Sequence, residues 1–236
     1  MKTLLASLVI FSFFIFSGNK ANAEGRERNV DPFSGISLRV PANLFLSQGD
    51  KQHIEIVTKA SALDEIITEV KEGKLIIRFP NKNYVWKDFE SGKIVIYITV
   101  PEINALSVSG SGDIIGEDGI KTRMLDLAVS GSGDINLQEL QAEQLKVTIS
   151  GSGDVAIKSN ETATDLSATI SGSGNLKALD FPVEDALIKV AGSGTCSVYV
   201  KNKMTVKVAG SGNVKYRGTP QIDKTVLGSG SVSNIE

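Results

Sequence analysis

Apolar and polar residues alternate along most of the chain after residue 30, and from residue 106 the pattern itself repeats. The tripeptide Gly-Ser-Gly occurs seven times, and its first glycines are 18 to 21 residues apart. Apolar residues stand two residues before and four residues after the first glycine of every copy, as Val108 and Ile114 do in the first. Because residues of one parity share a face of an extended strand, each copy predicts strands with one apolar face.

Repetition of this apolar column predicts how the strands assemble. One copy cannot bury its own apolar face, but stacked copies form a continuous core. We therefore expect an all-β fold, a right-handed β-helix-like solenoid with rungs of about 20 residues. In the last copy Lys224 occupies a position that the other copies fill with apolar residues. This lysine and the polar C-terminal residues predict a cap that protects the last rung from edge pairing.

The repeated glycines are interpreted as structural residues. A flexible linker is excluded, because linkers do not lie between alternating apolar residues at a fixed period. Counting parity along an extended strand places both glycines of a copy inward, where they allow a sharp bend or close approach of the walls. The intervening serine and the following Asp or Asn then face outward. The structural set is Gly110, Gly112, Gly131, Gly133, Gly151, Gly153, Gly172, Gly174, Gly192, Gly194, Gly210, Gly212, Gly228 and Gly230.

Residues 30–105 predict less regular strands that continue into the same sheets. Alternation indicates strands at 33–40, 43–47, 53–58, 67–71, 74–79 and 93–100. Glu72-Gly73 predicts a hairpin turn, and apolar spacing favours one helical turn near 62–66. Residues 80–92 form the longest irregular insertion, and the charged residues 24–30 are expected to be loose.

The first 23 residues have the features of a secretory signal peptide. Lys2 precedes an uncharged apolar stretch at 4–16, and Ala21-Asn22-Ala23 supplies a small-x-small cleavage site. Cleavage near Ala23 leaves residues 24–236 as a single solenoid domain, with repeats over 106–236. We expect an extracytoplasmic protein, periplasmic, secreted or at the cell surface. No second apolar run has spanning length, so no transmembrane segment is expected after leader removal.

Charge and cysteine content argue against nucleic-acid binding and against an intrachain disulfide. The chain has 25 basic and 27 acidic residues, and the leader removes only Lys2 and Lys20, so the mature balance is 23 against 27, or −4. A mildly acidic chain without a basic cluster is not expected to bind nucleic acid. The single cysteine, Cys196, excludes an intrachain disulfide and occupies an apolar column, which predicts a buried thiol.

A ladder of acidic residues is a candidate metal site. Asp113, Asp134 and Asp154 occupy equivalent outward positions in successive copies, where stacking would bring their carboxylates about 5 Å apart. Hard cations such as calcium prefer carboxylate and carbonyl oxygens. The alternative is a solvated face whose aspartates bond nearby amides. We expect no metal and no cofactor, with calcium as the weaker hypothesis.

The aromatic insertion is the candidate ligand site. Tyr84, Trp86 and Phe89 lie in a polar segment, where they could stack on sugar rings or contact a partner protein. The alternative is that they fold back over the apolar end of the sheet.

No catalytic residue is predicted. His53 is the only histidine and precedes an alternating strand, so it is interpreted as a surface residue. The sequence contains no nucleophile elbow, metal-ligand cluster or phosphate loop. A glycosidase or polysaccharide lyase that uses carboxylates alone stays open, because such sites need only acids and bases placed across a groove.

Several segments together resemble a known family. Phe33-Ser-Gly-Ile36, the turn Gln48-Gly-Asp50, the Ile-rich strand ending at Pro101 and the serial copies of Val-Ser-Gly-Ser-Gly-Asp-Ile resemble the auto-transporter adhesin head domain called GIN. The resemblance covers roughly residues 30–235. It implies a β-helix-like fold and an extracytoplasmic, adhesive role, and it supplies no catalytic residues.

Together these features predict an exported, non-catalytic binding or structural protein. Its regular Ser- and Asp-lined surface would be presented to glycans or cell-envelope components. Two alternatives stay open: a β-helical polysaccharide lyase or glycosidase, and an envelope scaffold that assembles end to end through exposed rungs. The oligomeric state is not predicted.

Overall fold

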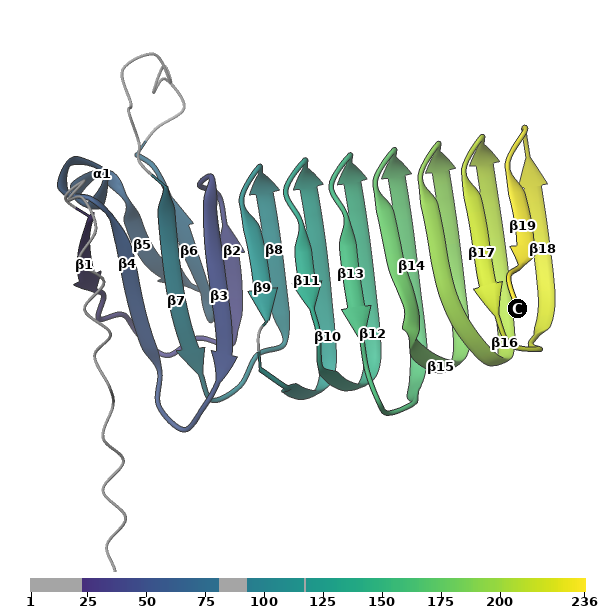
Figure 1. The fold of residues 1–236 in the computed structure, drawn as a ribbon, viewed down its shortest axis with the longest axis horizontal. Coiled ribbons are helices and arrows are strands. Elements are labelled where there is room, and N and C mark those ends of the chain that lie inside the picture. The colour runs from purple at the N-terminus through teal and green to yellow at the C-terminus, as the bar shows by residue number, and fades with distance from the viewer. Residues whose placement is uncertain (1–22, 81–92, 117) are drawn as a thin grey trace, which may run out of the picture.

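The computed structural model describes residues 23–80, 93–116 and 118–236. They form a β-solenoid of about six turns with about 20 residues per rung, so the all-β solenoid prediction is confirmed (Figure 1). Two layers of strands face each other across an apolar core, and the rungs stack along the long axis of the molecule.

Each repeat contributes a longer strand to one layer and a shorter strand to the other. The long-strand layer contains β8 (Ala105–Gly110), β10 (Ile120–Gly131), β12 (Leu140–Gly151), β14 (Ala163–Gly172) and β18 (Gln221–Leu227). The short-strand layer contains β9 (Asp113–Gly116), β11 (Ile135–Leu137), β13 (Val155–Lys158), β17 (Asn213–Arg217) and β19 (Ser231–Asn234). Two strands bend through both layers, β15 (Asn175–Gly192) and β16 (Thr195–Gly210). Neighbouring rungs pair in parallel, and the register shifts locally where β15 pairs with β13 and with β16.

The N-terminal strands extend both layers, as the sequence predicts. In the long-strand layer β2 (Gly35–Leu38) lies between β6 (Lys74–Arg78) and β8. In the short-strand layer β3 (Ala42–Gln48) lies between β7 (Ile94–Val100) and β9. The rung β6–β7 is therefore outside the rung β2–β3, although it comes later in the chain.

The N-terminal end of the stack is closed by antiparallel strands and one short helix. β4 (His53–Lys59) pairs with β7, and β5 (Ile67–Lys71) pairs with β6. Glu72 and Gly73 join β5 to β6 with positive φ angles of 52° and 70°, as the predicted hairpin turn requires. Helix α1 (Ala60–Glu65) connects the two layers and lies at this end (Figure 1).

The expectation that residues 24–30 are loose is wrong. β1 (Ala23–Glu27) pairs antiparallel with β4 and forms the edge of the short-strand layer. Arg26 forms an ion pair with Asp64, and Arg28 donates to the backbone carbonyl of Leu63, so both arginines bond to α1. Charged side chains are compatible with an edge strand, because one face of it meets solvent.

The predicted apolar columns form the core. Residues two before and four after the first glycine are buried in the first six copies and half-buried in the last. Parallel pairing stacks them in register, with Val108 beside Val129 and Ile114 beside Ile135. Burial of a Val, Leu or Ile side chain contributes about 1.5–3 kcal/mol, which makes this stacked column the main source of stability.

The glycine corners differ from the parity prediction in one respect. The second glycine of each copy is buried or half-buried, but the first is exposed or half-buried and has a positive φ, for example 126° at Gly151. A positive φ turns the chain at the first glycine, so the alternation is interrupted at this residue and resumes at the second glycine. The carbonyl oxygen of Gly131 accepts hydrogen bonds from the amides of Ser152 and Gly153, and successive corners are stacked in this way.

The two ends of the solenoid are unlike. α1 buries Ala62 and Leu63 at the N-terminal end. At the other end β18 pairs only with β16, and the outermost rung leaves Leu227 67% and Ile222 37% exposed. Within the described parts of the chain, no helix is both long and apolar enough to cross a bilayer.

Candidate functional site

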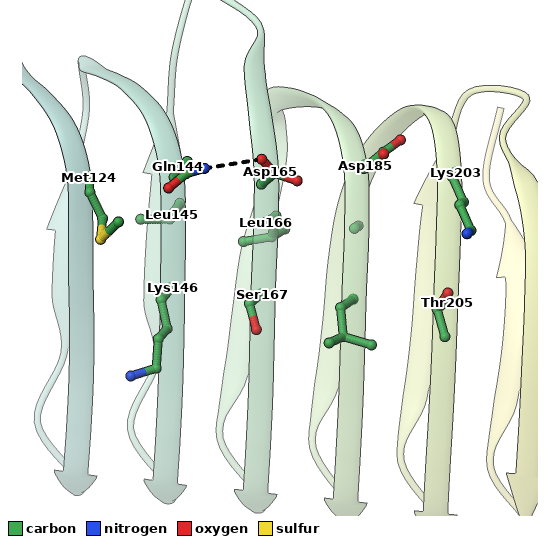
Figure 2. Close-up of a pocket in the computed structure, with 12 residues that line it drawn as sticks. Met124, Gln144, Leu145, Lys146, Asp165, Leu166, Ser167, Asp185, Lys203 and Thr205 are labelled. Carbon is green, nitrogen blue, oxygen red and sulfur yellow. Dashed lines mark hydrogen bonds between the residues drawn. The ribbon is translucent and has the colours of Figure 1, made fainter.

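A groove crosses the outer face of the long-strand layer. It has a volume of about 540 Å³ and is lined by side chains of β10, β12, β14, β15 and β16 (Figure 2). Five rungs at about 4.8 Å spacing make it roughly 19 Å long, running across the strands and along the solenoid axis.

The groove lies where each long strand interrupts its in–out alternation. On β14, Thr164 and Asp165 are both exposed, and Leu166 is the next buried residue. Two successive outward residues bend a strand locally, as a bulge does. Longer runs without a buried residue precede Leu145 on β12, at 141–144, and Met204 on β16, at 201–203. Because neighbouring rungs bend at equivalent positions, the bends align into one groove.

Apolar side chains line this groove in two ways: some are buried at its base, and two others are exposed to solvent. Leu145, Leu166 and Ala186 line it while remaining largely buried. Met124 and Leu187 are 48% and 39% exposed, so both present apolar surface to solvent along the groove. The groove therefore offers apolar contact to a ligand without rearrangement of the core.

Polar side chains are ordered in two rows across the groove. The first row pairs Gln144, Asp165, Asp185 and Lys203 on successive strands. The second row pairs Lys146, Ser167, Leu187 and Thr205. Each row thus presents one side chain per rung (Figure 2).

Hydrogen bonds hold part of the first row in place. Gln144 Nε2 donates to Asp165 Oδ2 at 3.4 Å, and Asn202 Nδ2 donates to Asp185 Oδ1 at 2.9 Å. At one side Lys146 Nζ contacts Asp126 at 2.9 Å. Within the described residues Lys203 has no hydrogen bond or ion pair, so its ammonium is available to a ligand.

The predicted aspartate ladder exists on the outer face of the short-strand layer. Asp113 Oδ1 accepts the backbone amide of Asp134 at 3.0 Å, and Asp134 Oδ1 accepts that of Asp154 at 2.7 Å. Asp154 Oδ1 continues the ladder to the amide of Asn175 at 3.0 Å. One oxygen of each carboxylate is therefore used to join successive rungs, which is the structural alternative to metal binding.

The calcium hypothesis for Asp113, Asp134 and Asp154 stays a prediction. The parts of the chain that the structure describes contain no group of three or more His, Cys, Asp or Glu side chains placed to hold a metal ion. Instead of a cation, Lys177 Nζ contacts Asp154 Oδ2 at 2.7 Å.

The pKa of Asp154 is shifted by its neighbours. Partial burial opposes ionisation, but hydrogen bonds from Lys177 and Asn175 outweigh it and hold the pKa of Asp154 below its ordinary value. The same contact raises the pKa of Lys177. This pair makes the carboxylate a fixed, charged part of the rung junction.

The candidate aromatic residues Tyr84, Trp86 and Phe89 lie outside the described residues. A different aromatic pair, not identified from the sequence, is present on the short-strand layer. Phe45 and Tyr97 stack with ring centroids 5.5 Å apart and an interplanar angle of 19°. Both alternate outward on their strands, which is the signal in the sequence that could have found them.

Two other predicted residues occupy the expected environments. His53 is exposed at the start of β4. Cys196 is a buried free thiol, and burial raises its pKa to about 12. A thiol this basic stays protonated at neutral pH and packs as an apolar side chain.

The groove residues were missed because they occupy ordinary strand positions. Two features of the sequence could have indicated the groove. Met124 and Leu187 are large apolar residues at outward positions, and pairs of polar residues such as Thr164 and Asp165 break the alternation of a strand. Such a break in alternation identifies a bend in one strand. Only the register between rungs shows that the bends align.

Solved structures of similar fold cover most of the chain. A putative adhesin from Bacteroides fragilis has a crystal structure with a TM-score of 0.84 and 27% identity, covering 92% of this chain and 98% of that one. Two structures from Parabacteroides distasonis, described as a putative lipid binding protein and a putative adhesin, are 24% and 21% identical. Their TM-scores are 0.75 and 0.70, and they cover 92% and 90% of this chain and 98% and 97% of their own. At that identity they support the fold alone.

No curated protein matches the chain. A family model described as "Putative auto-transporter adhesin, head GIN domain" matches residues 32–220, which is most of the described solenoid. The resemblance in the repeated glycine motif is thereby confirmed, and the chain belongs to this GIN head-domain family of adhesins.

Proposed function

We propose that the protein is an exported, non-catalytic adhesin whose long-strand groove binds an extended glycan of the cell envelope or of a neighbouring surface. Membership of an adhesin family supports an extracellular or surface role. The observation that carries the glycan assignment is the groove across five aligned rungs, in which polar side chains in two rows are combined with the apolar side chains of Met124 and Leu187.

The repeat of the groove suits a repeating ligand. Sugar units of a β-linked glycan advance along an extended chain by a distance close to the rung spacing, so each unit would face one rung. Its apolar C–H face would lie on Met124 and Leu187. Hydroxyl groups would donate to Asp165 and Asp185 and bond Ser167 and Thr205. N-acetyl methyl groups would add apolar contact, which favours N-acetylhexosamine chains over plain glucans.

The placement of the acids supports binding over hydrolysis. Glycosidases place two carboxyl groups on either side of the scissile bond. Asp165 and Asp185 are instead neighbours in one row, on the same side of any chain in the groove. Both also accept hydrogen bonds from side-chain amides, from Gln144 and Asn202.

The two methionines of the mature chain provide a direct test. Met124 lines the groove and Met204 is fully buried in the core. With methyl-labelled methionine, titration of chitohexaose, a β-1,4-linked N-acetylglucosamine hexamer, should shift the Met124 methyl resonance saturably and leave that of Met204 unchanged. Cellohexaose should bind more weakly.

A pair of matched variants tests whether Leu187 contacts the glycan. Leu187→Ser gives β15 the side chain that Ser167 has in the neighbouring rung, and should weaken binding measured at Met124 about fivefold. Lys215→Ser, on the outer face of the other layer, should have no effect. A Met124 resonance that does not respond to chitohexaose would contradict the glycan site. Release of reducing ends from the hexamer would contradict the non-catalytic assignment.

Export is tested separately. Expressed with residues 1–23, the protein should be recovered outside the cytoplasm with Glu24 as its N-terminal residue. Retention of residues 1–23 in that fraction would contradict the proposed cleavage near Ala23.

A further inference from the structure

The outer face of the short-strand layer has a second cluster of exposed apolar side chains. One row of outward positions runs Tyr97, Phe45 and Ile115 on β7, β3 and β9, in register. Tyr97 is 45% exposed, and Phe45 and Ile115 are half-buried. In the rungs that follow, the same row holds Asn136, Ala156, Lys177, Ser197 and Lys215. The apolar row is therefore confined to three adjoining rungs.

The two rings are fixed before any ligand arrives. Their backbones are paired central strands, and the rings stack on each other at 5.5 Å. A preformed aromatic surface loses little side-chain entropy on binding. Exposed apolar patches of this kind mark interaction sites on proteins that are otherwise polar outside.

Polar groups border the rings on the adjacent row. Asn43 and Asp113 are paired outward residues of β3 and β9, and they lie two residues along the strand from Phe45 and Ile115, about 7 Å away. Asp113 Oδ1 accepts the amide of Asp134, which fixes the carboxylate, and Oδ2 makes no hydrogen bond within the described residues. The amide of Asn43 makes no hydrogen bond within the described residues. On the other side Glu55 pairs with Tyr97.

We propose that Phe45, Tyr97, Asn43 and Asp113 form a second glycan site, which binds one or two pyranose rings of a β-linked chain. The rings of Phe45 and Tyr97 would take the apolar C–H face of a sugar, and Asn43 and Asp113 would bond its hydroxyl edge. An aromatic surface beside a fixed carboxylate and a free amide matches a ligand with one apolar face and polar edges. The choice of glycan rests on the proposed function of the groove.

Two sites on opposite layers give the molecule a function that the groove alone does not. The core separates the two outer faces, so one glycan chain cannot occupy both sites without wrapping around the solenoid. A monomer would therefore bridge two glycan chains. Bridging through two weak sites gives a strong combined attachment, because the second contact becomes intramolecular.

Calorimetry with chitohexaose and agglutination of chitohexaose-coated beads test this site. The wild-type monomer should bind two hexamers and agglutinate the beads. Tyr97→Ser, which matches Ser197 of the same row, should bind one hexamer, bind beads and fail to agglutinate them. Leu187→Ser should retain the second site, and a further Tyr97→Ser change in that background should lower the remaining affinity at least about tenfold. Lys215→Ser should behave as wild type.

The possible results distinguish the second glycan site from the glycan site in the groove. If Tyr97→Ser binds two hexamers and agglutinates as wild type does, the second site is overturned and the groove stands. If Met124 does not respond while Tyr97→Ser abolishes binding, the second site stands and the groove falls. Absence of all binding overturns both. Asn43→Ala, which leaves the rings intact, should weaken the second site without changing the melting temperature, which separates ligand contact from folding.

Discussion

At the scale of single residues, the outward Asp and Asn side chains act as junctions between rungs. A short side chain directly after the Gly-Ser-Gly corner reaches the amide of the next rung, as Asp134 does toward Asp154 at 2.7 Å. Asn175 and the amide of Thr195 continue the same bond at 3.1 Å, without a charge. The ladder therefore needs an acceptor oxygen at this position, and Asp154 adds a charge that is paired with Lys177.

Asp154 should make stability depend on pH. Because its folded-state pKa is lowered, its contribution is present above the unfolded value of about 3.9 and is lost as pH falls through the folded value. Asp154→Asn keeps an acceptor but loses the charge, so it should be destabilised at pH 7 by less than about 1 kcal/mol, since Lys177 is largely exposed. The melting-temperature gap to wild type should be smaller at pH 3 than at pH 7. A gap of equal size at both pH values would exclude this role, and Asp223→Asn provides the control.

At the scale of elements, the Gly-Ser-Gly corner has two glycines for two reasons. The first needs a positive φ to reverse the chain. The second needs space, because a Cβ on Gly153 would overlap the carbonyl oxygen of Gly133 in the rung below. Parity correctly places the second glycine inside, but it treats the corner as extended strand. It therefore misplaces the first glycine, whose backbone angle leaves no trace in the alternation.

Gly153→Ala should test the packing requirement. The added methyl cannot be accommodated without a shift of two stacked backbones, so we expect a loss of about 2–4 kcal/mol in the free energy of unfolding, measured by urea denaturation. Gly119→Ala is the matched control, because its Cβ would meet the Glu139 carboxylate at an ordinary 3.5 Å. Equal stability of the two variants would show that the corners do not stack tightly.

Alternation in the sequence predicts the strands but not the order in which all of them stack. Alternation predicts the strands, the buried columns and the turn at Glu72-Gly73, because each depends on residues close in sequence. It does not predict that β6–β7 lies outside β2–β3, since stacking order depends on contacts between distant segments. The groove and the Phe45–Tyr97 pair were missed for the same reason. Outward residues become a site only when the register places them side by side.

At the scale of the whole molecule, the two ends determine how copies could associate. Polymerisation from head to tail needs two open ends, but α1 and the antiparallel strands close the N-terminal end. At that end the outer strands β1 and β5 still have free edges, but these strands carry charged residues such as Arg26 and Glu69. At the other end the last rung presents free strand edges beside partly exposed Ile222 and Val226. Association through that rung would join two C-terminal ends and close as a dimer, so an end-to-end scaffold is disfavoured.

Lys224 is placed to prevent even this dimer. It lies in the inward column of the edge strand, in register with Val206, and an inward charge discourages pairing because it would be buried without a partner. Lys224→Val completes the apolar column, and light scattering after size-exclusion chromatography should show a concentration-dependent rise toward twice the monomer mass. Thr225→Val adds the same side chain on the outward face and should leave the mass unchanged. A Lys224→Val protein with the wild-type mass at every concentration would show that the edge is protected by something other than this charge, and growth beyond a dimer would show that α1 does not close the other end.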